Sequence, residues 1–161
     1  MNEQVKEILS RVAVETLEQL AFIFSSPEDG PGEIEYDSLM AASVSFAGPF
    51  AGGLVMTVSP QVVFELAANM LGVDNEETTL DQQYDALKES MNVICGNLLP
   101  AITGKQAVFN IGSPEIITGG EAIKEATEKY NGRSPTSMVR LDIDGEQCVL
   151  FLFGDIRITG E

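Results

Sequence analysis

The chain contains no histidine and no tryptophan, and only 9 of its 161 residues are lysine or arginine. The absence of histidine excludes Ser-His-Asp and Cys-His catalysis, histidine metal sites and imidazole acid–base chemistry. Neither a P-loop nor a dinucleotide-binding glycine fingerprint is present. An enzyme built from this sequence therefore has to work with carboxylates, amides and water.

Positive charge is scarce along the whole chain. The 25 acidic residues outweigh the 9 basic ones and give a formal net charge of −16 at pH 7. A surface of this sign repels nucleic-acid phosphates and anionic lipid headgroups, so we expect neither a nucleic acid nor a membrane as partner. The acidity by itself indicates a soluble protein.

Long apolar segments are also missing. The longest apolar run, 148–153, is far shorter than the roughly 20 residues of a membrane-spanning helix. The start of the chain, 1–6, lacks the basic region and apolar run of a secretory signal. Cys95 and Cys148 fall on expected core positions, and we interpret them as buried free thiols of a cytoplasmic protein. The sequence leaves a disulfide between them open.

The length and the apolar content of 44% are typical of one globular domain, which we take to span 1–161. Helical and alternating apolar patterns follow one another along it. The expected elements are a helix at about 2–24, strands at 36–46 and 53–58 with a turn at 48–52, helices at 61–71 and 80–103, extended pieces at 108–111 and 115–117, a helix at 121–129, and a hairpin of strands 137–143 and 147–153. Antiparallel hairpins with separate helices predict an α+β fold, with helices packed on an antiparallel sheet.

Local signals mark where several of these elements begin and end. Pro60 suits the first turn of the helix that Gly72 ends. Thr79 is expected to cap the long helix, with Gln82 as the partner in a capping box. Asp144–Gly145 between apolar strands predicts a tight hairpin turn.

The long helix, 80–103, carries the most informative pattern of the chain. At about 100° per residue, its apolar residues fall on one side: Tyr84, Leu87, Met91, Ile94, Cys95, Leu98 and Ile102. Asp85, Glu89, Asn92 and Gly96 fall in a narrow line on a different side. Glycine inside a helix costs about 1 kcal/mol relative to alanine, so helix stability does not explain Gly96. Its missing side chain would let another molecule come close to Asn92.

The pattern Asp-x3-Glu-x2-Asn-x3-Gly resembles the active-site signature of the CheC/CheX/FliY family of response-regulator phosphatases, with Asp85, Glu89, Asn92 and Gly96 in the matching positions. The expected order of elements fits the family over almost the whole chain. The resemblance therefore implies a pseudo-symmetric CheX/CheC-like fold.

The first helix carries a weak repeat of the signature. Glu18 corresponds to Glu89, but Val14 and Ala21 stand where the second copy has its aspartate and asparagine. CheC-like members carry two motifs in pseudo-symmetric halves, so a single complete motif makes CheX the closer relative and implies one active site. The alternative is that two amphipathic helices resemble each other by chance.

The resemblance implies hydrolysis of the phosphoaspartate of a CheY-type response regulator in bacterial chemotaxis or two-component signalling. Asn92 would orient the attacking water, because its amide offers both an acceptor and donors. Glu89 would pair with a lysine of the regulator, and Asp85 and Gly96 would serve docking. The divalent metal ion would belong to the regulator, so we expect no cofactor on this chain.

The family also implies a homodimer with sheets joined across the interface, for which the apolar run Val149–Phe153 would suit as an edge. A CheD-like protein, which regulates CheC relatives, is a further candidate partner. Two rival interpretations stay open: a non-catalytic regulator-binding or flagellar-switch adaptor that docks through the same helix, and an acidic scaffold module without a regulator partner. Separately, Gly119–Gly120 before a helix fits either an anion site or a simple linker.

Overall fold

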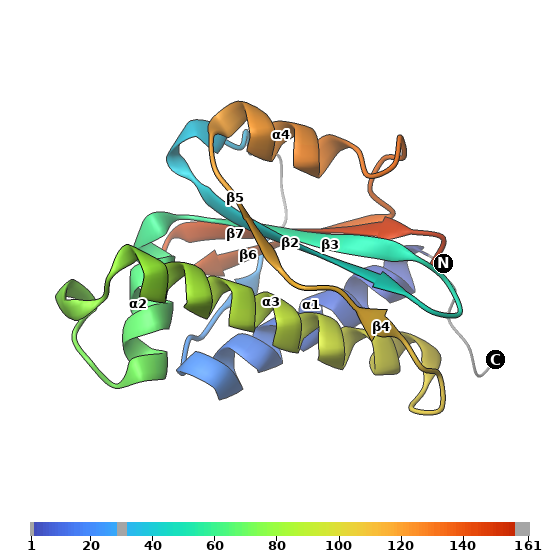
Figure 1. Ribbon diagram of the computed structural model, residues 1–161, viewed down its shortest axis with the longest axis horizontal. Helices are drawn as coiled ribbons and strands as arrows, with labels where there is room; N and C mark the ends of the chain where they lie inside the picture. The colour runs from blue at the N-terminus through green and yellow to red at the C-terminus, as the bar shows by residue number, and fades with distance from the viewer. Residues whose placement is uncertain (1, 29–31, 157–161) are drawn as a thin grey trace.

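The computed structural model describes residues 2–28 and 32–156 (Figure 1). Within these residues seven strands form one antiparallel sheet in the order β1-β6-β7-β3-β2-β4, with β5 also paired to β2. The strands are β1 (Ser26–Pro27), β2 (Met40–Ala47), β3 (Gly52–Val58), β4 (Asn110–Ile111), β5 (Glu115–Ile117), β6 (Ser137–Ile143) and β7 (Glu146–Gly154).

The described part of the chain also contains four α-helices and two short 3-10 helices. They are α1 (Asn2–Ala21), η1 (Tyr36–Ser38), α2 (Pro60–Leu71), η2 (Asn75–Glu77), α3 (Leu80–Thr103) and α4 (Gly120–Glu128). Figure 1 shows α1, α2 and α3 on one face of the sheet and α4 on the other. The predicted α+β class, with helices packed on antiparallel hairpins, is confirmed. Among these helices none is long and apolar enough to cross a membrane.

The strand order divides the sheet into two equivalent halves. One half consists, from its edge inward, of β1, β6 and β7, and β1 is the short strand that follows α1. The other half consists, from its edge inward, of β4, β2 and β3, and β4 is the short strand that follows α3. In the same way α1 packs on β6, α3 packs on β2, and the two helices pack against each other. This arrangement is the pseudo-symmetry that the family resemblance implied.

The core lies mainly between the sheet and the three helices α1, α2 and α3. A second, smaller cluster lies on the α4 face and contains Val55, Val149, Phe151 and Phe153, with Ile34 and Tyr130 packed against it. Strand β7 contributes to both clusters, because its alternate side chains point to opposite faces of the sheet.

The expectation that Val149–Phe153 forms a free edge is wrong. These residues lie in β7, which is paired on one side with β6 and on the other with β3. The run is continuously apolar because both faces of a central strand are covered, and such strands do not show a polar side. Its backbone groups are therefore not available to a second sheet.

Most predicted ends agree with the structure, and the local signals explain them. The Ser59 hydroxyl accepts from the backbone N–H of Val62 at the start of α2, and Gly72 ends that helix with a φ of 72°. Asp144 and Gly145 take φ values of 52° and 84° in the turn between β6 and β7. Positive φ at both central residues gives the turn the twist that a two-residue hairpin needs.

Two boundaries differ from the prediction. The first helix ends at Ala21 because Phe22 takes a φ of 54°, which turns the chain and sends Ile23 into the core. The strand predicted from residue 36 begins only at Met40, because Tyr36–Ser38 forms a 3-10 turn. In both cases the apolar pattern continues past the point where the backbone changes direction.

Candidate functional site

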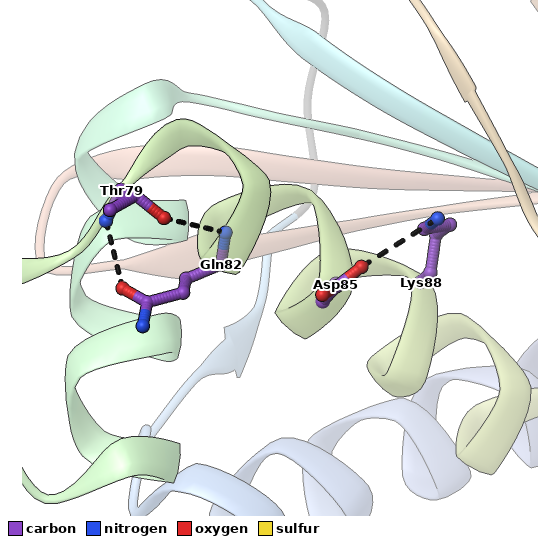
Figure 2. Close-up of polar contacts among 4 residues, drawn as sticks. All are labelled: Thr79, Gln82, Asp85 and Lys88. Atoms are coloured by element: carbon purple, nitrogen blue, oxygen red, sulfur yellow. Dashed lines mark hydrogen bonds and ion pairs between the residues drawn. The ribbon is translucent and has the colours of Figure 1, made fainter.

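Helix α3 holds all four residues of the predicted line, and its start is fixed by a capping box. The Thr79 hydroxyl accepts a hydrogen bond from the Gln82 N–H at 3.1 Å, and the Gln82 side-chain oxygen accepts one from the Thr79 N–H at 2.9 Å (Figure 2). Both bonds satisfy backbone donors that the first turn of a helix leaves unpaired. The predicted capping box is therefore confirmed.

The buried side of α3 fixes the rotation of the helix. The predicted apolar residues from Leu87 to Ile102 are at most 1% exposed, while Tyr84, the fifth residue of the helix, is half-buried. Ser90 on the same side donates its hydroxyl proton to the Ala86 carbonyl at 2.8 Å, so its polar group is satisfied inside the helix. With this side held against α1, α2 and the sheet, the opposite side has to face solvent.

Asp85, Glu89, Asn92 and Gly96 all lie on that exposed side. Their spacing keeps them in one line over three turns of helix. Within residues 2–28 and 32–156, neither the Glu89 side chain nor the Asn92 side chain has a hydrogen bond or ion pair with another residue. The structure thus brings the four predicted residues together and leaves the carboxylate and the amide at the centre of the line free to contact another molecule.

Gly96 is not required by the packing of the chain itself. Among the described residues, a Cβ atom placed here would meet no atom within 4 Å beyond the adjacent residues and the backbone of the same helix. Its backbone is helical and not in the left-handed region where glycine is favoured. The missing side chain leaves a bare patch of helix surface, one turn after Asn92.

Lys88 is a neighbour of the line that the sequence analysis did not single out. Its Nζ lies 3.7 Å from Oδ1 of Asp85, and the two side chains are 39% and 76% exposed respectively (Figure 2). Acid and base three residues apart on a helix are a recognised pair, so the spacing alone contained the signal. An exposed pair of this kind contributes only about 0.3–0.5 kcal/mol.

The equivalent position on α1 is closed. Glu18 is exposed and Val14 half-buried, but Ala21, the counterpart of Asn92, is fully buried. The Ala21 carbonyl accepts a hydrogen bond from the Asn69 amide of α2 at 2.7 Å. At the position equivalent to Asn92, α1 is therefore in contact with α2 and has no exposed side chain.

The glycine pair Gly119–Gly120 has a structural explanation. The carboxylate of Asp37, at η1, packs directly against Gly120, and a Cβ atom there would overlap it. Helix α4 and η1 are in contact. An acidic side chain of the chain itself thus occupies the start of α4, where a helix attracts negative charge.

Cys95 and Cys148 are both buried and not joined to each other. Burial raises the pKa of each thiol from 9.0 to about 12. A buried protonated thiol is a poor nucleophile and a poor metal ligand. Among the described residues, no group of three or more acidic or sulfur side chains is placed to hold a metal ion.

The hollows of the surface lie away from the predicted line. The most enclosed of five, about 350 Å³, lies between α4 and strands β2 and β3, on the other face of the sheet from α3. None of the five is lined by a residue of α3. The line is thus an exposed helix face outside these five hollows, and such a face suits contact with another macromolecule better than capture of a small molecule.

Comparison with known proteins finds a family model, described as chemotaxis phosphatase CheX, that matches residues 40–136. Similar solved structures include the CheX–CheY complex with BeF3 and Mg from Borrelia burgdorferi, 17% identical with a TM-score of 0.66, where the match covers 92% of this chain and 96% of that one. CheX from Vibrio vulnificus is 12% identical with a TM-score of 0.69, covering 96% and 99%. FliY from Thermotoga maritima is 16% identical with a TM-score of 0.56, covering 95% and 91%. No curated protein matches the chain.

Proposed function

The chain belongs to the CheX family of chemotaxis phosphatases, and from that premise we propose that it hydrolyses the phosphoaspartate of a CheY-type response regulator. One observation carries the proposal. Asp85, Glu89, Asn92 and Gly96 lie exposed in one line on α3, while the opposite side of the helix forms the core. The Borrelia burgdorferi complex, in which a CheX is bound to CheY, supports the kind of partner.

Asn92 is the residue proposed to position the attacking water. Hydrolysis of an acyl phosphate needs a water in line with the leaving carboxylate, and catalysis of phosphoryl transfer is mostly positioning and electrostatics. The amide oxygen accepts a hydrogen bond from the water, and the amide holds the water in place without changing charge. The divalent metal ion that neutralises the phosphoryl oxygens would be bound by the regulator.

The other residues of the line are proposed to hold the two proteins together. Glu89 lies three residues before Asn92 on the same side of α3, so its carboxylate would pair with a lysine of the regulator as Asn92 enters the site. Asp85 would contact the regulator at the edge of the interface. Gly96, which has no side chain, would let the regulator's surface come close to the helix. We take 1–161 as a single phosphatase domain that acts in the cytoplasm, where its regulator would be found.

A direct test measures the decay of a phosphorylated CheY-type regulator with and without the protein. The wild type is expected to accelerate decay, and Asn92→Ala is expected to lose about 100-fold of that acceleration, as a misplaced reactant does. Glu89→Ala should weaken docking. Asn97→Ala is the matched control, because this amide lies on the same helix but donates to the Thr16 hydroxyl at 3.2 Å and points toward α1.

The rival function is a regulator-binding adaptor, and the same assay separates the two. Binding of the regulator without faster decay would support the adaptor and overturn the phosphatase. If Asn97→Ala loses as much acceleration as Asn92→Ala, the exposed line of α3 is not the catalytic part of the helix.

We also propose that the protein is a homodimer, as the family resemblance implied. Since β7 is central, an edge-to-edge contact would have to use another strand. Strand β1 covers only part of β6, with pairs at Leu141 and Asp142, and Met138 on the same strand is 39% exposed. Sedimentation equilibrium would measure the state of association, and a monomer at micromolar concentration would contradict the proposal. A CheD-like protein that regulates this chain remains a further expected partner.

A further inference from the structure

The exposed side of α3 that is proposed to dock is negatively charged, although its proposed target, a phosphoaspartate, is also negative. Asp81, Asp85 and Glu89 are exposed on this side of the helix, and the chain as a whole has a net charge of −16. A phosphoaspartate is itself anionic. A negatively charged helix face and an anionic phosphoaspartate repel each other as they approach, which lowers the rate and the strength of association.

Lys88 is the one basic residue of α3, a helix that is described along its whole length. It lies four residues before Asn92 and one before Glu89, so it stands beside the line on the adjacent turn. Its side chain is 39% exposed, and a partly covered lysine commonly rests its aliphatic stem on the protein surface while its ammonium stays in water. The ammonium thus stands within one helical turn of the residue proposed to enter the regulator's site.

The ion pair that holds Lys88 in the free protein is loose. The distance of 3.7 Å between Nζ and Oδ1 of Asp85 exceeds the roughly 2.7–2.9 Å of a charged hydrogen bond. Asp85 is 76% exposed, so water screens the pair. Lys88 can therefore leave Asp85 for another anion at little cost.

We propose that Lys88 is a docking residue for the phosphorylated regulator. In the free protein Asp85 keeps the ammonium beside the line, and on docking the ammonium turns to the anionic phosphoaspartate. It offsets the repulsion between the two proteins at the point where Asn92 enters. This inference rests on the proposed function and names a residue and a role that the four-residue signature does not contain.

The experiment measures the rate of regulator dephosphorylation against regulator concentration, at about 20 mM and about 500 mM salt. The variants are Lys88→Gln, Lys88→Glu and Lys88→Arg. Lys124→Glu is the matched control, because Lys124 is an exposed lysine on α4, across the sheet from α3. Thermal unfolding of each variant shows whether the fold is kept.

At low salt we expect KM to rise about 3-fold in Lys88→Gln and about 10-fold in Lys88→Glu, with kcat within about two-fold of the wild type, because a charge at the rim acts on association. Lys88→Arg should restore the wild-type KM. At high salt the differences should shrink, since ions screen exposed charges. A purely structural lysine would change the unfolding midpoint and leave KM and its salt dependence alone.

The outcomes separate this inference from the function beneath it. If the wild type does not accelerate decay, the proposed function itself fails. If the wild type accelerates decay but Lys88→Glu and Lys124→Glu have the same KM at low salt, the role of Lys88 is overturned while the phosphatase stands.

Discussion

Gly96 is a residue that neither helix stability nor the packing around it calls for. In the described part of the chain, no atom beyond the adjacent residues and the backbone of the same helix lies within 4 Å of the place a Cβ would take, and the backbone there is helical. A glycine in a helix interior destabilises by about 1 kcal/mol relative to alanine. A residue that weakens the helix and fills no tight space is most simply explained by the approach of a partner.

Gly96→Ala is therefore expected to raise the free energy of unfolding by up to about 1 kcal/mol, because alanine loses less backbone entropy. The same variant should lower phosphatase activity, and a larger side chain such as Gly96→Leu should lower it further. Urea denaturation and the dephosphorylation assay measure the two effects. Greater stability with unchanged activity in both variants would show that the bare surface is not used.

The two cysteines make stability depend on alkaline pH. Burial raises both pKa values from 9.0 to about 12, so above pH 9 the unfolded thiols release protons while the folded ones keep them. Their contribution is complete below pH 9, and the free energy of unfolding falls from there toward pH 12, by up to about 1.4 kcal/mol per pH unit for each thiol.

Urea denaturation between pH 8 and 11 measures this loss. The control is the double variant Cys95→Ala, Cys148→Ala, in which the slope of stability against pH should be shallower, even though the absolute stability is lower. Equal slopes in the two proteins would contradict buried, protonated thiols.

At the scale of the element, α3 joins the core to the site. Its buried side packs on α1, α2 and the sheet, and its capping box fixes where the helix starts. Because each residue advances the helix by about 100°, these two features determine the direction of every side chain on the exposed side. The geometry of the line is thus a consequence of the packing of the opposite face.

Removing the capping bond at Thr79 should destabilise the protein without changing the exposed residues from Asp85 to Gly96. Thr79→Ala is expected to lower the free energy of unfolding by about 1 kcal/mol, because the Gln82 N–H loses its acceptor. Thr118→Ala, at an exposed threonine outside the helices, is the control and should change stability by less than about 0.5 kcal/mol. Chemical denaturation measures the free energy of unfolding of both variants. Equal losses in the two would show that the capping bond does not stabilise the protein.

At the scale of the whole molecule, β7 connects the two clusters of buried residues. It lies at the centre of the sheet, with α1, α2 and α3 on one side and α4 on the other (Figure 1). Phe153 belongs to the cluster on the α4 face, is 0% exposed, and has its ring 5.9 Å from that of Tyr130. Through Ile34 and Tyr130, the small cluster attaches the segment before η1 and the segment after α4 to the sheet.

Phe153→Ala is expected to lower the free energy of unfolding by about 3–5 kcal/mol, since it leaves a cavity in a closed site. Met138→Ala, at 39% exposure on neighbouring β6, should cost far less. Guanidinium denaturation measures both. A loss for Phe153→Ala as small as that for Met138→Ala would mean that the α4 face is not a packed core.

The sequence by itself determined the features that depend on neighbours a few residues apart. The bounds of α3, the capping box at Thr79 and the turn at Asp144–Gly145 follow from local hydrogen bonds and local backbone preferences. The line from Asp85 to Gly96 follows from the period of the helix, which is the same wherever the helix lies. For these reasons the candidate site was visible in the printed sequence.

Only the tertiary structure decided what depends on contacts between distant segments. An apolar run such as Val149–Phe153 suits either an edge that pairs with a second copy or a central strand, and the choice rests on β3 and β6, the neighbours of β7. The Ala21 carbonyl is likewise paired with Asn69 of α2, which lies 48 residues further along the chain. Periodicity tells which residues are apolar together, but the partner that covers them is chosen by long-range packing, because several partners bury the same surface equally well.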